Sequence, residues 1–268
     1  MATIVFLHAH PDDEASATSG SMARAAQRGD RVVVVFATNG DHGEVPKSLH
    51  PGETIVERRR SEAEAAAAVI GTQRIAWLGY KDSGMTGWEM NDAPGSFWSA
   101  DLDEAANRLA KILDEEDADV LVGYDWHGNY GHPDHVKVHP VAYRAAQLAR
   151  RRPRVLESTT NRDAMVRSFQ AAKEAGLQID FDPTGPADDG NPMGTPEAEI
   201  HWVVDVRDLT DVKRRALLCH ASQASDVGML TGMPDEVFAQ SFGLEHFREH
   251  GRPNGMVAGW PFTPLHTP

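Results

Sequence analysis

The sequence has only one cysteine, Cys219, so no disulfide can form within the chain. Disulfides mark proteins of oxidising compartments, and nothing in this sequence requires one. Cys219 falls in an expected helical run over residues 213–220, where a buried structural thiol is the default. A catalytic thiol is therefore not expected.

The sequence also lacks long hydrophobic runs. No segment approaches the ~20 consecutive apolar residues of a membrane-spanning helix. The first seven residues are mostly apolar, but they are too few for a secretory signal and have no basic leader. We expect a cytoplasmic protein without a membrane span.

Basic residues are scarce relative to acidic ones. The chain has 26 Lys and Arg against 40 Asp and Glu, a formal net charge of -14. This balance argues against nucleic-acid binding, which depends on clustered positive charge. Two short arginine clusters, at residues 58–60 and 150–152, are expected on helices, the second as a solvated face. We expect a small-molecule partner, and the sequence leaves a homo-oligomer open.

The remaining composition is that of a globular protein, with 41% hydrophobic and 25% charged residues in 268. Short apolar runs rich in β-branched residues lie at residues 4–7, 31–37, 75–78 and 120–123, and helical patterns lie between them at 15–28, 53–70 and 102–116. Continuous hydrophobicity is typical of parallel strands covered on both faces. The sequence thus predicts an α/β fold, a Rossmann-like open, mostly parallel sheet with helices on both faces.

The second half of the chain is less regular. Residues 181–196 contain several Pro and Gly and predict a long loop. A strand is expected at 200–206, helices at 209–222 and 235–249, and a tail from 252 to 268 that wraps the surface. We expect one domain over residues 1–268, with a doubly wound core in 1–160 and a less regular part in 161–268 that completes the substrate side.

Two histidine-rich motifs each follow an expected strand: residues 10–14 (HPDDE) and 132–135 (HPDH). Ligands of open parallel sheets bind at the carboxyl ends of the strands, so the fold should bring both motifs to one edge. Taken singly, the first motif could occur by chance, and the second could be a helix start with Asp134 as the N-cap. Together they predict a metal site.

The two motifs supply two imidazoles and a carboxylate in His10, Asp13 and His135. This set suits zinc, with another divalent ion such as Fe²⁺ as an alternative, and leaves positions open for water and substrate. Asp12, adjacent to the ligand aspartate, is available as a general base. If protonated, His132 would stabilise the oxyanion and then protonate the leaving amine.

Three further side chains near the motifs are expected to support the site without binding the metal. Asp134 is placed to hydrogen-bond an imidazole and fix its tautomer. Glu14, at a helix start, is expected to cap the helix or support the site. His8 shares a strand face with His10 and is expected to pack behind it.

With both motifs in view, the chain resembles the LmbE-like (PIG-L) superfamily of zinc-dependent N-acetylglucosaminyl deacetylases. Members of that superfamily carry an early HPDDE-type motif and a later HPDH-type motif. The resemblance implies that His10, Asp13 and His135 bind the metal, that Asp12 is the general base and that His132 is the catalytic histidine.

Residues 8–14, 82–85 and 130–135 are most similar to the actinobacterial mycothiol-pathway branch, which contains a glucosaminyl-inositol deacetylase and a conjugate amidase. The resemblance implies that Asp82 contacts the sugar, that Tyr130 is a mobile active-site residue and that Arg59 binds substrate hydroxyls or phosphate. From the residues alone, a simple turn at Asp82 and a solvated helix position for Arg59 stay open. The chain departs from the conjugate amidases at Ala17, where they carry a lysine.

The sequence therefore predicts metal-dependent hydrolysis of an N-acyl amide, most simply N-acetyl, on an amino sugar or its conjugate. One alternative is an amidase acting on a larger thiol conjugate. Others, from different classes, are a non-haem iron oxygenase, which also uses two histidines and a carboxylate, and a non-catalytic sugar-binding protein.

Overall fold

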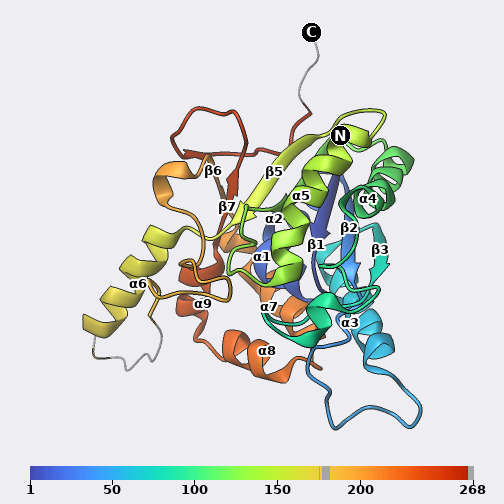
Figure 1. Ribbon diagram of the computed structural model, residues 1–268. Coiled ribbons are helices and arrows are strands. Elements are labelled where there is room, and N and C mark those ends of the chain that lie inside the picture. Colours follow the sequence, from blue (N-terminus) through green and yellow to red (C-terminus); the bar gives the residue numbers. More distant parts are fainter. Residues whose placement is uncertain (175, 177–181, 265–268) are drawn as a thin grey trace.

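The described strands form one eight-stranded sheet in the computed structural model, which describes residues 1–174, 176 and 182–264 (Figure 1). The strands are β1 (Thr3–His8), β2 (Arg31–Thr38), β3 (Arg74–Tyr80), β4 (Val120–Tyr124), β5 (Arg154–Thr159), β6 (Trp202–Asp205), β7 (Leu244–Arg248) and β8 (Val257–Ala258). Their order across the sheet is β3-β2-β1-β4-β5-β7-β6-β8.

The first five strands run parallel, whereas β7 is antiparallel to both β5 and β6. After β1 the chain moves outward through β2 and β3 and then returns to place β4 on the other side of β1. The carboxyl ends of β1 and β4 thus flank the point where strand order reverses, which is where open α/β sheets bind ligands.

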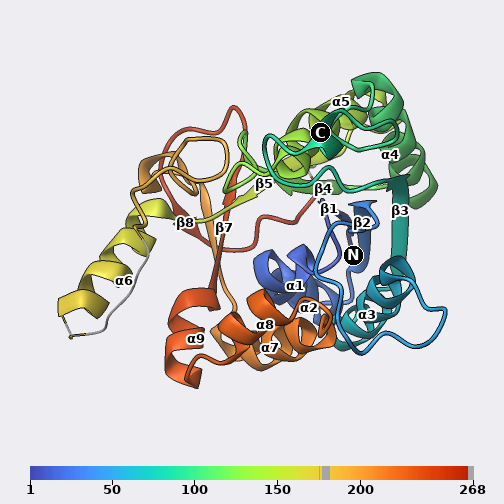
Figure 2. The same ribbon diagram turned by 60° about the horizontal axis from the view of Figure 1, so that its bottom comes forward.

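Helices cover both faces of this sheet (Figure 2). Helices α4 and α5 pack together on one face, and α1, α2, α3 and α7 gather on the other. The helices are α1 (Asp13–Ala17), α2 (Ser19–Gln27), α3 (Ile55–Ile70), α4 (Leu102–Glu116), α5 (Pro133–Leu148), α6 (Arg162–Glu174), α7 (Thr210–Cys219), α8 (Ala224–Thr231) and α9 (Asp235–Phe242), with short 3-10 turns η1 (Glu89–Asp92), η2 (Glu197–Glu199) and η3 (Arg207–Leu209).

The core has two layers because successive strand residues point to opposite faces. In β1, Val5 and Leu7 pack with side chains of α4 and α5, while Ile4 and Phe6 pack with side chains of α2, α3 and α7. All four are at most 1% exposed. A central strand buried on both faces explains the continuous apolar run and confirms the predicted α/β fold.

Three local details differ from expectation. The helix predicted over 15–28 is interrupted at Thr18, which separates α1 from α2 and whose Oγ1 lies 2.9 Å from His8 Nε2. The arginine cluster at 150–152 is not helical, since α5 ends at Leu148. Cys219, expected to be buried, is half-buried at the end of α7.

The largest correction concerns residues 235–249, predicted as one helix. Only Asp235–Phe242 is helical, and Leu244–Arg248 forms β7 between β5 and β6. Glu245 and Phe247 are 4% and 0% exposed and alternate with more exposed neighbours, which is the period of a strand. The predicted strand at 200–206 and helix at 209–222 are confirmed as β6 and α7.

The predicted loop and tail are partly outside the described residues. Residue 181 lies outside them, and residues 182–196 form neither a helix nor a named strand, as expected. In the tail, residues 265–268 lie outside the described part. Phe262 is fully buried, with its ring centroid 5.8 Å from that of Phe6 and 5.1 Å from that of Phe247, so the tail enters the core as well as wrapping the surface.

None of the described helices is both long and apolar enough to cross a bilayer.

Candidate active site

The turn after β1 brings two candidate metal ligands close together. His10 follows the end of β1, and Asp13 begins α1; the Asp13 carboxylate accepts the His10 amide at 2.8 Å. Between them, Asp12 has φ 118°, in the left-handed region. A non-glycine residue there costs about 1–3 kcal/mol and persists only where surrounding contacts hold it. The sharp turn at Asp12 therefore depends on the contacts that surround it.

The loop after β4 supplies the third donor. Helix α5 starts at Pro133, and its N-cap is His132, whose Nδ1 accepts the Asp134 amide at 3.2 Å. Proline at the first helical position is preorganised for a helix start. The first turn of α5 then directs His135 toward His10, with their ring centroids 5.2 Å apart.

These three side chains present facing donor atoms. His10 Nδ1 lies 3.3 Å from His135 Nε2 and 3.5 Å from one oxygen of Asp13, whose other oxygen lies 3.3 Å from His135 Nε2. With metal–ligand bonds of 2.0–2.1 Å, the corners of a tetrahedral site are roughly 3.3–3.4 Å apart. The donor set and spacing therefore fit a first-row divalent ion.

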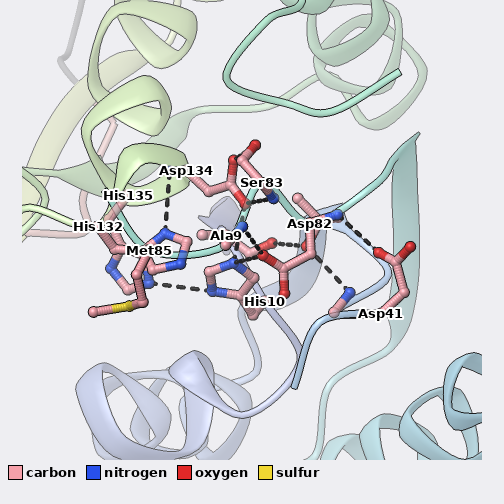
Figure 3. Close-up of polar contacts among 12 residues, drawn as sticks. Ala9, His10, Asp41, Asp82, Ser83, Met85, His132, Asp134 and His135 are labelled. Carbon is pink, nitrogen blue, oxygen red and sulfur yellow. Dashed lines mark hydrogen bonds and ion pairs between the residues drawn. The ribbon is translucent and has the colours of Figure 1, made fainter. Parts of the chain in front are cut away.

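The far side of the His10 ring is held by carboxylates (Figure 3). His10 Nε2 lies 3.2 Å from Asp134 Oδ2 and 3.5 Å from Asp82 Oδ1. Asp134 is fully buried and also accepts the amide and hydroxyl of Ser83. A carboxylate on one ring nitrogen fixes the tautomer, which leaves the Nδ1 lone pair of His10 for a metal.

Asp12 lies beside this cluster and is held by Arg59. The Arg59 guanidinium donates to Asp12 Oδ2 at 2.9 Å, to the Pro11 carbonyl and to the Gly40 carbonyl at 2.9 Å. Burial raises the pKa of the Asp12 carboxyl to about 6, although Arg59 opposes the shift. Arg59 is only 3% exposed, so in this conformation its polar contacts are with the protein, and the expected substrate contact stays a prediction.

His132 faces the cluster from the other side. One of its ring nitrogens lies within 4.8 Å of those of His10 and His135. Burial and these two imidazoles lower the pKa of His132 to about 2. Since its Nδ1 accepts a main-chain amide, the neutral ring carries its proton on Nε2.

The remaining predicted residues lie in the same cluster. Tyr130 Oη is 3.3 Å from His135 Nε2, and Asp82, 5% exposed, accepts the Gly84 amide at 2.8 Å. Asp82 thus makes a hydrogen bond within its turn and also lies in the site. His8 is buried behind the site, 2.8 Å from Tyr124 Oη, and does not join the facing donors.

The sequence motifs did not reveal two supporting residues. The Tyr124 ring stacks on that of His135, with centroids 4.9 Å apart and planes at 30°. His220, immediately after the last residue of α7, contacts Glu14, which lies more than 200 positions away in the sequence. Tyr124 ends an apolar strand and His220 ends a helix, so neither position carries a local signal of its contact.

Gly128 is required beside His135. Its φ is 61°, and an added Cβ would lie 2.3 Å from His135 Cβ and 2.4 Å from the His135 carbonyl carbon. We expect Gly128→Ala to displace His135. If His135 is a metal ligand, the affinity for added zinc should then fall about 10- to 100-fold, measured by competition with a chromogenic chelator. Gly95, which also has positive φ but open space around its Cβ position, is the control: Gly95→Ala should leave zinc affinity unchanged. Equal affinities for the two variants would contradict the expectation.

Comparisons with known proteins identify relatives of this chain. The chain is 34% identical to the 1D-myo-inositol 2-acetamido-2-deoxy-alpha-D-glucopyranoside deacetylase of Thermobispora bispora over 279 residues, 96% of this chain and 91% of the relative. Among solved structures, it resembles the N,N'-diacetylchitobiose deacetylase of Pyrococcus horikoshii (TM-score 0.57, 21% identity, 92% of this chain and 83% of that chain).

A further solved structure shows that similarity of fold does not by itself identify the reaction. The 4-carboxy-2-hydroxymuconate hydratase of Pseudomonas putida KT2440 matches with a TM-score of 0.56 and 18% identity over 94% of this chain and 97% of that chain. One fold thus accommodates proteins named for different reactions, and activity must be argued from the site. The family model described as GlcNAc-PI de-N-acetylase matches residues 5–146, which include both histidine motifs. This chain belongs to the PIG-L (LmbE-like) family.

Proposed function

We propose that this protein is a metal-dependent deacetylase that hydrolyses the N-acetyl amide of an amino-sugar conjugate, with an N-acetylglucosaminyl-inositol as the leading candidate. The observation that carries the proposal is the facing donor set of His10, Asp13 and His135 with Asp12 beside it. The names of the relatives support the substrate class. Family membership favours hydrolysis over the oxygenase and sugar-binding alternatives.

His10, Asp13 and His135 would hold the ion, which we propose to be zinc. When bound, it would supply Lewis-acid activation of the amide carbonyl and of water. Asp134 and Tyr124 keep the two imidazoles in place.

The protein's own groups would handle the protons and the developing charge. Asp12 accepts a proton from the water as the water oxygen bonds to the carbonyl carbon. His132 donates a hydrogen bond from Nε2 to the carbonyl oxygen as negative charge develops there. Asp12 then returns the proton to the nitrogen as the carbon–nitrogen bond breaks. The products are the free amine and acetic acid, which ionises to acetate on release.

This scheme modifies the role of His132 expected from the sequence. The expectation used a protonated His132 as the acid for the leaving amine. Its burial beside two imidazoles, and the main-chain amide on its Nδ1, favour the neutral ring instead. The proton on the departing amine then comes from Asp12.

Asp82, Tyr130 and Arg59 are proposed to act on the substrate side. Asp82 and Tyr130 adjoin His10 and His135 and would contact the sugar and the reacting carbonyl. Arg59 is proposed to act mainly through Asp12, which it already holds.

Removal of the metal gives the direct test. We expect a chelator to abolish release of free amine from N-acetylglucosaminyl-inositol and added Zn²⁺ to restore it, because the carbonyl and the water would both lose their activating ion. Amine can be quantified with a fluorogenic reagent, with Fe²⁺ under anaerobic conditions as the competing metal. Full activity in the chelated, metal-free protein would contradict the proposal.

The same assay separates the amidase alternative. An amidase for a larger thiol conjugate would release amine faster from the conjugate than from the N-acetyl sugar, whereas the proposed deacetylase would show the reverse order of kcat/KM.

A further inference from the structure

A buried carboxylate connects the turn at Asp12 to the second half of the chain. Glu14 is 2% exposed, and its two oxygens have different partners. One accepts the Asp12 amide at 2.9 Å, and the other accepts Nε2–H of His220 at 2.8 Å. His220 is fully buried and lies immediately after the last residue of α7.

The Asp12 main chain needs this kind of support. Its φ of 118° is unfavourable for a residue with a Cβ, so the conformation persists only where surrounding contacts hold it. The Asp12 carbonyl accepts the amides of Ala15 and Ser16 at 3.0 and 3.3 Å. On the amide side, the described partner is the Glu14 carboxylate. The direction of the Asp12 side chain therefore depends on Glu14, which holds the main chain, as well as on Arg59, which holds the carboxylate.

His220 is itself held in place by the residues that follow it. Ser222 donates its amide and its hydroxyl to the Glu62 carboxylate on α3, at 2.9 and 2.7 Å. Gln223 accepts the Glu44 amide and donates to the Glu44 carbonyl. His220 Nδ1 is buried with no hydrogen-bond partner among the described residues. Within that part of the chain, the ring therefore makes its hydrogen bond through Nε2, to Glu14.

We propose that His220 is a positioning residue for deacetylation: by donating Nε2–H to Glu14, it fixes the carboxylate that holds the Asp12 main chain in its turn. The inference rests on the proposed role of Asp12 as the group that takes the proton from water. Without the donor, Glu14 loses the partner of one buried oxygen, and the turn gains alternative conformations. Among the described residues, no hydrogen bond or ion pair joins the His220 ring to His10, Asp13 or His135, the proposed metal ligands.

Two substitutions of similar polarity test the contact. In His220→Gln, the amide nitrogen can stand near the position of Nε2 and donate to Glu14, whereas in the shorter His220→Asn it cannot reach. We expect the asparagine variant to lose about 10- to 100-fold in kcat with KM and zinc content nearly unchanged, and the glutamine variant to recover most of the loss.

The control is a buried histidine elsewhere in the fold. His201, 6% exposed, bonds through Nε2 to the Arg252 carbonyl and through Nδ1 to the Glu249 amide. His201→Ala should lower thermal stability without changing kcat. If the asparagine variant does not fold, His220→Ala replaces it as the variant without a donor.

Amide hydrogen exchange supplies a readout that does not depend on turnover. Exchange of a peptide covering residues 9–16 should be faster in His220→Asn than in wild type and close to wild type in His220→Gln. This comparison can be made on the zinc-loaded protein without substrate. Equal exchange in the two variants, or equal kcat, would overturn the proposal.

A double substitution separates this inference from the proposed function. If His220 acts through Asp12, His220→Asn should have little further effect on kcat in an Asp12→Ala background. An undiminished loss there would overturn the positioning role while leaving Asp12 as the base. Conversely, unchanged kcat in Asp12→Ala alone would overturn the role of Asp12 and hence the basis of the inference.

Discussion

Replacement of Asp12 by alanine is expected to lower kcat for deacetylation about 100- to 10,000-fold while zinc stays bound, because Asp12 carries the proton transfers in the proposed scheme. Its carboxylate is not one of the facing donors; it pairs instead with Arg59 at 2.9 Å. Metal analysis of the purified variant and steady-state release of amine measure the two quantities separately.

The adjacent aspartate provides the contrast. Asp13 places its two oxygens 3.5 Å from His10 Nδ1 and 3.3 Å from His135 Nε2. Asp13→Ala should therefore lose zinc as well as activity, whereas Asp12→Ala should lose activity alone. Near wild-type kcat in zinc-loaded Asp12→Ala would show that another group takes the proton from water. Loss of zinc from Asp12→Ala would instead place that carboxylate among the ligands.

Much of this site could be predicted because its parts depend on local patterns and one topological rule. The apolar runs that became β1 and β4 are buried on both faces, so their sequences are almost continuously hydrophobic. Each histidine motif lies in the segment that follows one of these strands. Once the strands are parallel neighbours at the reversal of strand order, the motifs must meet at one edge.

The second half was harder to predict because its elements are defined by distant contacts. Residues 244–248 follow Gly243, the C-cap of α9, and they become a strand by pairing with β5. That partner strand ends at Thr159, 85 residues before Leu244. Glu245 also contradicts a simple apolar pattern, because a charged residue occupies a buried position. Sequence periodicity cannot show that a lysine from helix α7 will neutralise it.

The supporting contacts of the site were also hard to predict, because they too join residues that are distant in the sequence. The sequence carries no local signal of the contact made by His220, since its partner Glu14 is 206 positions away. Arg59 looked like a helix-surface residue or a substrate ligand, yet the loop at Gly40 and Gly43 closes over its guanidinium. Hydrogen-bond partners of this kind become visible only when α3 and α7 are placed against the β1 turn.

The buried pair of Lys213 and Glu245 carries the second large expected effect. The two side chains meet at 2.5 Å, and the residues are 0% and 4% exposed. Lys213 also donates to the Ser16 carbonyl at 3.0 Å, and the Glu245 carboxylate accepts the amides of Gly20 and Ser21 at 2.9 and 2.8 Å. These amides lie in the first turn of α2, so one ion pair joins α7, β7 and the helix behind the active-site turn.

Lys213→Met is therefore expected to lower the free energy of unfolding by about 3–5 kcal/mol, because it leaves the Glu245 carboxylate buried without a cation. Urea unfolding of the zinc-free protein measures the loss, with the m-value checked for constancy. The matched control is Arg215→Met, which removes an exposed partner of Asp211 on the same helix and should cost less than about 1 kcal/mol.

Neutralising the stranded carboxylate should then recover much of the stability. Adding Glu245→Gln to Lys213→Met removes the buried charge but keeps an oxygen that can accept one of the two α2 amides. The double variant should be more stable than Lys213→Met alone, since the cost comes from an unpaired charge rather than from lost packing. If Lys213→Met and Arg215→Met unfold at the same urea concentration, the buried pair is not what holds β7 and α7 to the first half of the chain.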